Sequence, residues 1–434
     1  MRQMKDSGIE WIGEIPQAWD ANRLRNLIVR REGGVWGLEP DDYEQGTICL
    51  RVADFNFGKG RFVEDNIDAF TKRKYSYAQI LKYKLKKGDI LIEKSGGGEK
   101  TPVGRAVLFD KAFTALFANF MDRLRFNNEI VNPYFIEYWL RAWYYCGASP
   151  YYINQTIGIQ NINLSLMLAK QIIFYPPLAE QERIAGFLDA KCAEVDALAG
   201  EIKEQIATLE EYKRSVITEA VTKGLDASVP MKDSGIEWIG EIPQSWDLRK
   251  GKYVLQYLQK PVRIDDEVIT CFRDGQVTLR GNRREDGFTM ADKEIGYQGI
   301  DEGDLVVHGM DGFAGAIGIS DCGGKASPVL NVLDTRQNKR YVMFYLRSLA
   351  YRDVFLALST GIRVRSCDLR WNKLAELFYL IPPLAEQEQI VAKIDEMLAK
   401  VDALIAEKQN QLATLEEYKK SVIFEYVTGK KEVV

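Results

Sequence analysis

Arginine, lysine and side-chain amides gather in short stretches of this sequence, and such side chains read base pairs in the major groove of DNA. Arginine pairs with guanine through two parallel hydrogen bonds, and asparagine or glutamine pairs in the same way with adenine. In the first half of the chain the candidates are Lys59, Arg61, Lys72, Arg73, Lys74, Lys94, Lys100, Arg105, Asn154, Gln155, Gln160 and Asn161. In the second half they are Arg273, Arg280, Arg283, Arg284, His308, Arg363, Arg365 and Arg370. A solvated position at the surface also explains any single one of these residues. We therefore predict DNA contact for the residues as a set.

The stretch KSGGGEKT at 94–101 resembles a phosphate-binding loop but departs from it at the decisive position. In such a loop a glycine directly precedes the lysine and a helix follows, so that backbone N–H groups surround the phosphate. Here Glu99 separates the glycines from Lys100, and Pro102 follows. We therefore interpret the stretch as a glycine-rich loop near the backbone of a ligand, and not as a nucleotide site.

Two further features resemble catalytic sites. Asn132-Pro133-Tyr134-Phe135 is similar to the catalytic tetrapeptide of amino-methyltransferases, but it has one proline where that motif has two. A helix N-cap followed by proline explains it without chemistry. His308 is the single histidine, and we interpret it as a structural or DNA-proximal loop residue. The six cysteines form no CxxC pair, which gives no zinc signal. We expect no catalytic residue, metal or cofactor in this chain.

The net charge of −4 hides an uneven distribution along the chain. Residues 21–175 carry a net charge of +6, residues 248–381 carry +3, and the remaining segments carry −13. Basic domains favour a polyanionic ligand, while the acidic segments favour other partners. The most apolar stretches, such as Tyr134 to Cys146, are short, and this one is interrupted by Glu137 and Arg141. Since Met1 is not followed by a charged and then apolar leader, we expect a cytoplasmic protein that does not span a membrane.

These candidates must be positioned by two repeated segments, of which the longer one predicts a pair of helices. Residues 176–222 recur as 382–428 at an offset of 206 residues without a gap. Apolar side chains recur in each copy every seven residues, which is typical of a coiled-coil seam. The predicted seam consists of Leu188, Val195, Ile202, Leu209, Val216, Ile394, Val401, Leu415 and Val422. We place Leu198, Tyr212, Leu404, Leu412 and Tyr418 on the neighbouring row, and expect Gln205 and Gln411 near the seam to fix its register. The alternative is two ordinary amphipathic helices on separate cores.

The shorter repeat defines how the helices run. Residues 4–20 recur as 231–247 and differ only at Ala18 and Ser245. Each half of the chain is thus a short repeat, a variable region and a long helix. Because only Leu225 to Pro230 separates the first helix from the second short repeat, the helices must be antiparallel, with a domain at each end and a pseudo-two-fold axis. We predict boundaries at 1–175 (short repeat and first domain), 176–224 (central helix), 225–381 (short repeat and second domain) and 382–434 (C-terminal helix).

The two variable regions share landmarks despite their different sequences. The turn and strand at 88–92 have a counterpart at 303–307, and the helix that follows Asn132 has one after Asn338. Gly158-Ile159 likewise has a counterpart in Gly361-Ile362. We predict an α+β protein in which both regions have the same mixed α/β fold but different surface residues.

The two diverged domains, the PPLAEQE openings of the long helices and the GIEWIGEIPxxW short repeats together resemble the specificity subunits of type I restriction–modification systems. The resemblance covers essentially the whole chain. It implies a non-catalytic subunit whose two target-recognition domains each read half of an asymmetric, interrupted DNA site. It also implies as partners two modification subunits, which carry S-adenosylmethionine and methylate adenine, and restriction subunits with an ATP- and Mg-dependent translocase and nuclease. Two alternatives stay open: a self-contained DNA methyltransferase, and a coiled-coil adaptor that does not bind DNA.

Overall fold

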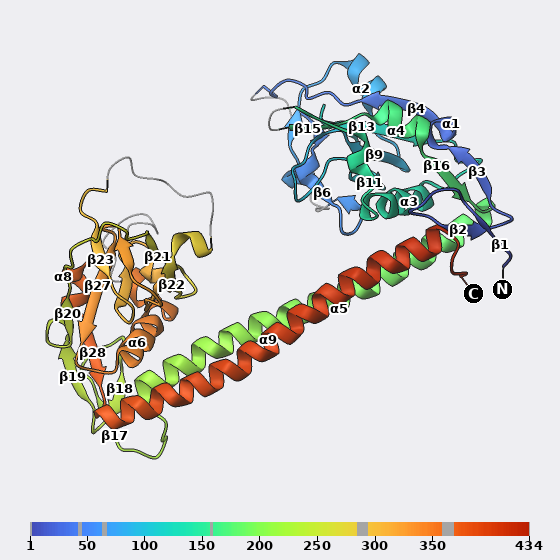
Figure 1. Ribbon diagram of the computed structural model, residues 1–434. Coiled ribbons are helices and arrows are strands. Elements are labelled where there is room, and N and C mark those ends of the chain that lie inside the picture. Colours follow the sequence, from blue (N-terminus) through green and yellow to red (C-terminus); the bar gives the residue numbers. More distant parts are fainter. Residues whose placement is uncertain are drawn as a thin grey trace. The chain divides into compact units, whose positions relative to one another are not determined.

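The computed structural model describes residues 2–41, 46–62, 67–156, 159–283, 294–357 and 369–433. The chain forms two compact units, of which unit 1 contains Met1–Ile202 and Asn410–Val434, and unit 2 contains Lys203–Gln409. Each long helix begins in one unit and ends in the other (Figure 1).

The elements of the first half of the chain, in order, are β1 (Met4–Asp6), β2 (Glu14–Pro16), β3 (Asp20–Arg23), α1 (Leu24–Leu27), β4 (Ile28–Gly33), β5 (Thr47–Leu50), β6 (Phe55–Asn56), β7 (Arg61–Phe62), β8 (Lys72–Arg73), α2 (Tyr77–Tyr83), β9 (Asp89–Glu93), β10 (Ser95–Gly96), β11 (Ala106–Phe109), β12 (Ala115–Phe117), β13 (Met121–Phe126), α3 (Pro133–Tyr145), β14 (Ile153–Thr156), β15 (Ile159–Ile162), α4 (Leu164–Lys170), β16 (Ile172–Tyr175) and the long helix α5 (Leu178–Lys223).

The elements of the second half are β17 (Met231–Asp233), β18 (Glu241–Pro243), β19 (Asp247–Lys250), β20 (Leu255–Tyr257), β21 (Ile269–Cys271), β22 (Val277–Leu279), β23 (Gln298–Ile300), β24 (Leu305–His308), β25 (Ile317–Ile319), β26 (Gly324–Ala326), β27 (Leu330–Thr335), α6 (Lys339–Tyr351), α7 (Val354–Ala357), α8 (Trp371–Glu376), β28 (Phe378–Ile381) and the long helix α9 (Leu384–Val427).

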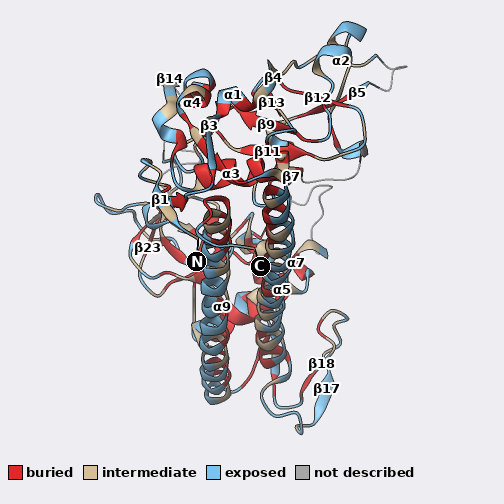
Figure 2. Ribbon diagram, turned by 90° about the vertical axis from the view of Figure 1, so that its right-hand side faces the viewer, coloured by how far each residue is buried: buried red, intermediate tan, exposed pale blue. Residues whose placement is uncertain are grey.

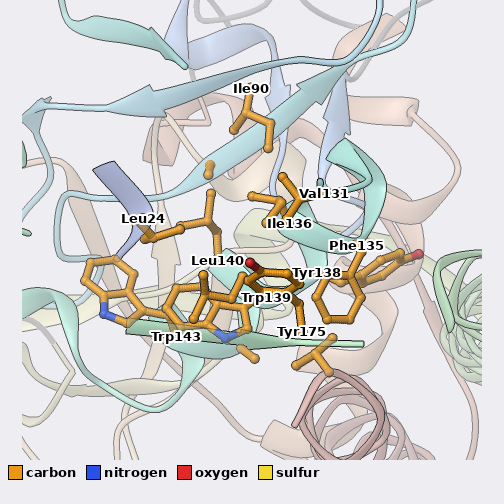
Figure 3. Close-up of a cluster of buried hydrophobic side chains, with 14 of the residues drawn as sticks. Leu24, Ile90, Val131, Phe135, Ile136, Tyr138, Trp139, Leu140, Trp143 and Tyr175 are labelled. Atoms are coloured by element: carbon orange, nitrogen blue, oxygen red, sulfur yellow. The ribbon is translucent and has the colours of Figure 1, made fainter. Parts of the chain in front are cut away.

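The centre of unit 1 is an antiparallel sheet with the strand order β11-β9-β13-β4. Side chains alternate between its faces: Ile90 and Leu124 join a core with α3, whereas Leu91 and Val107 join a second core with the small β12-β5-β8 sheet. Because both faces are covered, β9 is buried along its whole length. Figure 3 shows α3 side chains such as Trp139 and Trp143 in the first core. Figure 2 draws much of this sheet and of α3 as buried, whereas α2 is mostly exposed.

Unit 2 repeats this arrangement with the strand order β25-β24-β27-β20. Leu305 and Val307 face a core with α6, and Val306 and Val332 face a second core. The prediction that both variable regions share one mixed fold is therefore confirmed, since α6 also lies 206 residues after α3 and packs on its sheet in the same way.

The two long helices pack against each other in each unit, and in each unit they run antiparallel. In unit 1 Ile184 and Leu188 of α5 share a core with Ile423 of α9, and the rings of Phe187 and Tyr426 lie 4.4 Å apart. In unit 2 the end of α5 shares a core with the start of α9 through Ile217, Val221, Ile390 and Ile394. The alternative of separate helices on separate cores is therefore wrong.

The predicted seam is present, but its second row was misplaced by one residue. Leu188, Val195, Ile202, Ile394, Val401 and Val422 are buried, and Leu209, Val216 and Leu415 are partly buried. Of the predicted neighbouring row, Leu412 is partly buried, but Leu198, Tyr212, Leu404 and Tyr418 are exposed. Cys192, Ile405 and Lys419 are buried instead, because this row follows the first by four residues and not by three.

Gln205 and Gln411, which were expected near the seam, are both exposed. Two equivalent ion pairs link the helices. The Nζ atom of Lys213 lies 2.6 Å from Oδ1 of Asp402 in unit 2, and Nζ of Lys419 lies 2.6 Å from Oδ1 of Asp196 in unit 1. Because each pair joins residues of different helices, it favours one alignment of the two helices over a shifted one.

Each short repeat packs on the end of the long helix from the other half of the chain. Trp19 lies in one core with Val427 of α9, and Trp246 lies in one core with Val221 of α5. The helices are followed by left-handed glycines, Gly224 and Gly429. A Cβ atom on Gly429 would lie 2.5 Å from the Pro16 ring and 2.9 Å from the Trp19 ring. Glycine there both ends the helix and admits the short repeat.

Candidate DNA-binding surface

The predicted amides and part of the glycine-rich stretch come together in one small sheet of unit 1. Its strand order is β10-β15-β14, with Ser95 opposite Asn161 and Asn161 opposite Asn154. Gln155 lies opposite Gln160. The side chain of Gln155 lies outside the described residues, and so does Gly158, the predicted counterpart of Gly361. Segments more than 60 residues apart in the sequence thus form one polar sheet.

The amides of this sheet have different roles. Gln160 is buried, and its Oε1 accepts a hydrogen bond from the backbone N–H of Val103 at 3.2 Å. Asn154 is exposed, and Asn161 is partly buried with its Oδ1 accepting from the Ser95 hydroxyl at 2.6 Å. Gln160 therefore holds the sheet on the domain, and the two asparagines remain at the surface.

Within the glycine-rich stretch Gly97 lies against the protein's own backbone, whereas Gly98 has open space around it. Gly97 has φ +67°, and a Cβ atom there would lie 2.7 Å from the Val103 nitrogen and 3.0 Å from Oε1 of Gln160. Glycine is required because the loop folds closely onto its own domain. Lys100, at the end of the stretch, is exposed.

The two predicted cations nearest this sheet have different surroundings. Lys94 shares the carboxylate of Asp122 with Arg31, each at 2.8 Å. Arg105 pairs with Glu93 at 3.0 Å and lies over the Phe57 ring at 3.8 Å. The Arg105 charge is matched, whereas the Asp122 cluster holds two cations against one anion.

The basic strand β8 is paired with acidic residues of neighbouring loops. Lys72 lies 3.0 Å from Asp68, Lys74 lies 2.6 Å from Asp41, and Arg73 pairs with Glu39. The Arg73 guanidinium also lies 4.2 Å from the centre of the Trp36 ring. A phosphate would have to compete with these carboxylates.

Arg61, predicted as a DNA contact, faces carboxylates of its own unit. Its guanidinium lies 3.2 Å from the buried Glu137 of α3 and 3.0 Å from Asp189 of α5, and only 16% of its side chain is exposed. Burial raises the pKa of Glu137. Arg61 therefore ties the β6–β7 turn to the helices, while Lys59 in the same turn is exposed.

In unit 2 the candidates around the equivalent β21–β22 hairpin are largely paired. Arg273 lies 2.8 Å from Asp311, and Arg283 lies 2.5 Å from Asp274 with its guanidinium 4.5 Å from the Phe272 ring centre.

The other candidates of unit 2 are only partly described. The Nε of Arg280 donates to the Thr270 hydroxyl at 3.2 Å, and Arg370 is the N-cap residue of α8. Arg284, Arg363 and Arg365 lie outside the described residues, as do Gly361 and Ile362.

His308 stabilises a turn, which supports the structural interpretation of this residue. Its Nδ1 accepts hydrogen bonds from the backbone N–H groups of Met310 at 3.2 Å and Asp311 at 3.0 Å. Burial lowers its pKa. An acceptor at Nδ1 requires the neutral ring, so the lowered pKa and the hydrogen bonds agree.

Two residues that the sequence interpretation missed connect the long helices to the domains. The glutamine of each PPLAEQ motif is fully buried. Gln181 accepts from the Asn132 N–H at 2.8 Å and donates to the carbonyls of Ile130 and Pro176. Gln387 accepts from the Asn338 N–H at 3.0 Å in the same way. The available signal in the sequence was the glutamine at the same position of both motifs. A helix start that faced only solvent would not require an amide at that position.

Among the described residues, no group of three or more histidine, cysteine, aspartate or glutamate side chains is arranged to hold a metal ion. Within the same part of the chain, every helix is too short or too polar to cross a membrane.

Comparison with known proteins gives this surface a context. Residues 66–208, which include the β10-β15-β14 sheet, match the family described as "Type I restriction modification DNA specificity domain". Residues 66–208 thus carry the likeness to a specificity domain of this kind. The resemblance found from the tandem repeats is thereby confirmed.

Curated relatives of this family match different lengths of the chain. The "Putative type I restriction enzyme MjaX specificity subunit" of Methanocaldococcus jannaschii is 27% identical over 243 residues, which is 55% of this chain and 52% of that protein. The "Type I restriction enzyme StySPI specificity subunit" of Salmonella potsdam is 22% identical over 436 residues, covering 96% of this chain and 90% of that protein.

The fold is shared with a solved structure described as "Structural basis underlying complex assembly and conformational transition of the type I R-M system". The TM-score is 0.67 at 14% identity, and the match covers 96% of this chain and 99% of the other. The two long helices and mixed domains of this chain therefore represent a known architecture.

Proposed function

We propose that this chain is the non-catalytic subunit that recognises an asymmetric, bipartite site on duplex DNA and directs adenine methylation and restriction by partner subunits. The observation that carries the proposal is one sheet topology used twice with different surface residues. In the equivalent β6–β7 and β21–β22 hairpins, unit 1 exposes Lys59, whereas unit 2 exposes Arg273 and Asp274. Two scaffolds of one fold with different polar residues suit two different half-sites.

The partners in this proposal are two modification subunits and the restriction and translocase subunits. S-adenosylmethionine, ATP and magnesium belong to these partners and not to this chain. Because its ligand is cellular DNA, we place the chain in the cytoplasm. The long helices set the distance between the half-sites.

The experiment is methylome sequencing of a host that lacks other methylation and expresses this chain with its modification subunit. We expect methylated adenines within one motif made of two specified blocks and an unspecified gap. A second arm inserts four residues after Ala207 and after Ala413, the equivalent position of α9. That insertion is expected to change the gap or abolish methylation.

Four results would contradict parts of this proposal. Methylation without sequence preference would remove the specificity function. An unchanged gap in the insertion variant would remove the role of the helices as a spacer. Methyl transfer by the purified chain alone would favour the self-contained methyltransferase, and binding of the modification subunit without any DNA recognition by the complex would favour the adaptor.

A further inference from the structure

One face of the β14–β15 ribbon presents side chains that the domain does not use for packing. Asn154 and Asn161 lie directly opposite each other, and Ile159 lies two residues before Asn161 on β15. Because alternate residues of a strand share a face, these three side chains point to the same side. Asn154 is exposed, Asn161 is partly buried, and 51% of Ile159 is exposed.

The opposite face of the ribbon is committed to the domain. Gln160 and Ile162 are buried, and Gln160 accepts the hydrogen bond from Val103. The alternation therefore decides which amides are available to a ligand: the two asparagines are, and Gln160 is not. The sequence alone could not distinguish the two asparagines from Gln160, because all three side chains are uncharged amides.

The Ser95 hydroxyl orients the Asn161 amide. It donates to Oδ1 at 2.6 Å, and this places the amide nitrogen on the other side of the group. An amide oxygen has two lone pairs and accepts a second hydrogen bond, while the NH₂ group donates. Asn161 therefore retains the donor and the acceptor that bidentate pairing with adenine N7 and N6 requires.

Excess positive charge lies at one end of this ribbon. Arg31 and Lys94 share the single carboxylate of Asp122. Lys94 directly precedes β10, and its carbonyl accepts from the N–H of Ile162 at 3.0 Å. Arg31 also donates to the Ser165 hydroxyl, three residues beyond the end of β15. Two cations against one anion suit a phosphate beside the ribbon.

We propose that the β14–β15 ribbon enters the major groove and that Asn154, Ile159 and Asn161 read A·T pairs there, with Arg31 and Lys94 at the flanking phosphates. The major groove admits a two-stranded β-ribbon, asparagine pairs with adenine, and an apolar side chain contacts the thymine methyl group. The inference rests on the proposed DNA recognition and deepens it: the half-site read by unit 1 contains A·T pairs.

The first test uses the full chain assembled with its modification subunits and a library of duplexes randomised over both half-sites. N154A and N161A are expected to lose preference at one or two A·T positions of one half-site, with a decrease of about 5- to 150-fold in discrimination at each. N128A, at an exposed asparagine before α3, is the matched control and should keep the wild-type motif. The thermal stability of N161A is compared as well, because this change also removes the partner of Ser95.

The outcomes distinguish the assignment of the β14–β15 ribbon from the broader proposal that the complex recognises DNA. A wild-type complex without sequence preference would remove DNA recognition itself. A specific wild-type complex whose motif is unchanged in N154A and N161A would leave recognition intact and overturn the ribbon. Loss of preference at G·C positions would overturn the assignment to A·T pairs.

The second test replaces thymine by uracil at the A·T positions found in this way, which removes only the methyl group. Binding by the wild-type complex is expected to weaken several-fold, whereas I159A should bind both duplexes equally. K94Q should weaken binding to all sequences alike and reduce the salt dependence by about one counterion. Equal sensitivity of wild type and I159A to uracil would remove Ile159 from the contact.

Discussion

Replacing Gln181 by alanine tests how strongly the PPLAEQ motif holds α5 to the domain of unit 1. The wild-type amide is fully buried and makes hydrogen bonds to three backbone groups, of Asn132, Ile130 and Pro176. Each such bond contributes about 1 kcal/mol net, and a buried partner left unpaired costs about 1–3 kcal/mol. We therefore expect the Q181A variant to lose about 3–5 kcal/mol of unfolding free energy in unit 1.

Calorimetry and hydrogen exchange measure this loss. For a unit of this size, about 3–5 kcal/mol corresponds to a decrease in Tm on the order of 10 °C. The Asn132 amide, which loses its acceptor, should exchange at least about a hundredfold faster. Q181E should be less stable still, because it places a buried carboxylate against the carbonyls of Ile130 and Pro176.

Two controls define the interpretation. The Q17A variant changes an exposed glutamine of the same unit and should melt like the wild type. The Q387A variant should affect unit 2, where Gln387 accepts from Asn338, and leave the exchange of Asn132 unchanged. If Q181A melts and exchanges like Q17A, the buried amide does not anchor the helix and the reasoning is refuted.

Two further predictions concern lysines of the long helices and His308 of unit 2. K419M should destabilise unit 1 by about 1–3 kcal/mol, since it leaves Asp196 and the Gly58 carbonyl without the buried lysine. K213M should cost less than about 1 kcal/mol in calorimetry, because the Lys213–Asp402 pair is more exposed. Equal losses in the two variants would contradict this. Because burial lowers the pKa of His308 below 6.5 in the folded state, its contribution to the stability of unit 2 is present above pH 6.5 and is lost as pH falls through the folded-state pKa. H308N keeps an acceptor for the turn without titrating, so urea unfolding at a series of pH values should show a smaller acid loss in this variant, and parallel pH profiles would refute the assignment.

Much of the architecture could be read from the sequence because repetition is visible without coordinates. The offset of 206 residues, the heptad of the long repeat and the short connection at 225–230 required two antiparallel helices and two related domains. Periodicity indicated which helix face is apolar, but it did not decide whether the second row follows by three or four residues. That choice depends on which side chains the partner helix covers, as the exposed Leu404 and the buried Ile405 show.

The roles of the polar residues were decided only by the tertiary structure. Arg61 and Lys59 are two residues apart in one basic turn, yet Arg61 meets Glu137 and Asp189 from distant helices and Lys59 remains exposed. Asn161 and Gln160 are neighbours, but the pleat of β15 turns one outward and buries the other. The sequence by itself determined the repeats, the helices and the kinds of side chain available. Which of those side chains face a ligand depends on strand register and on partners distant in the chain, and neither is encoded in local spacing.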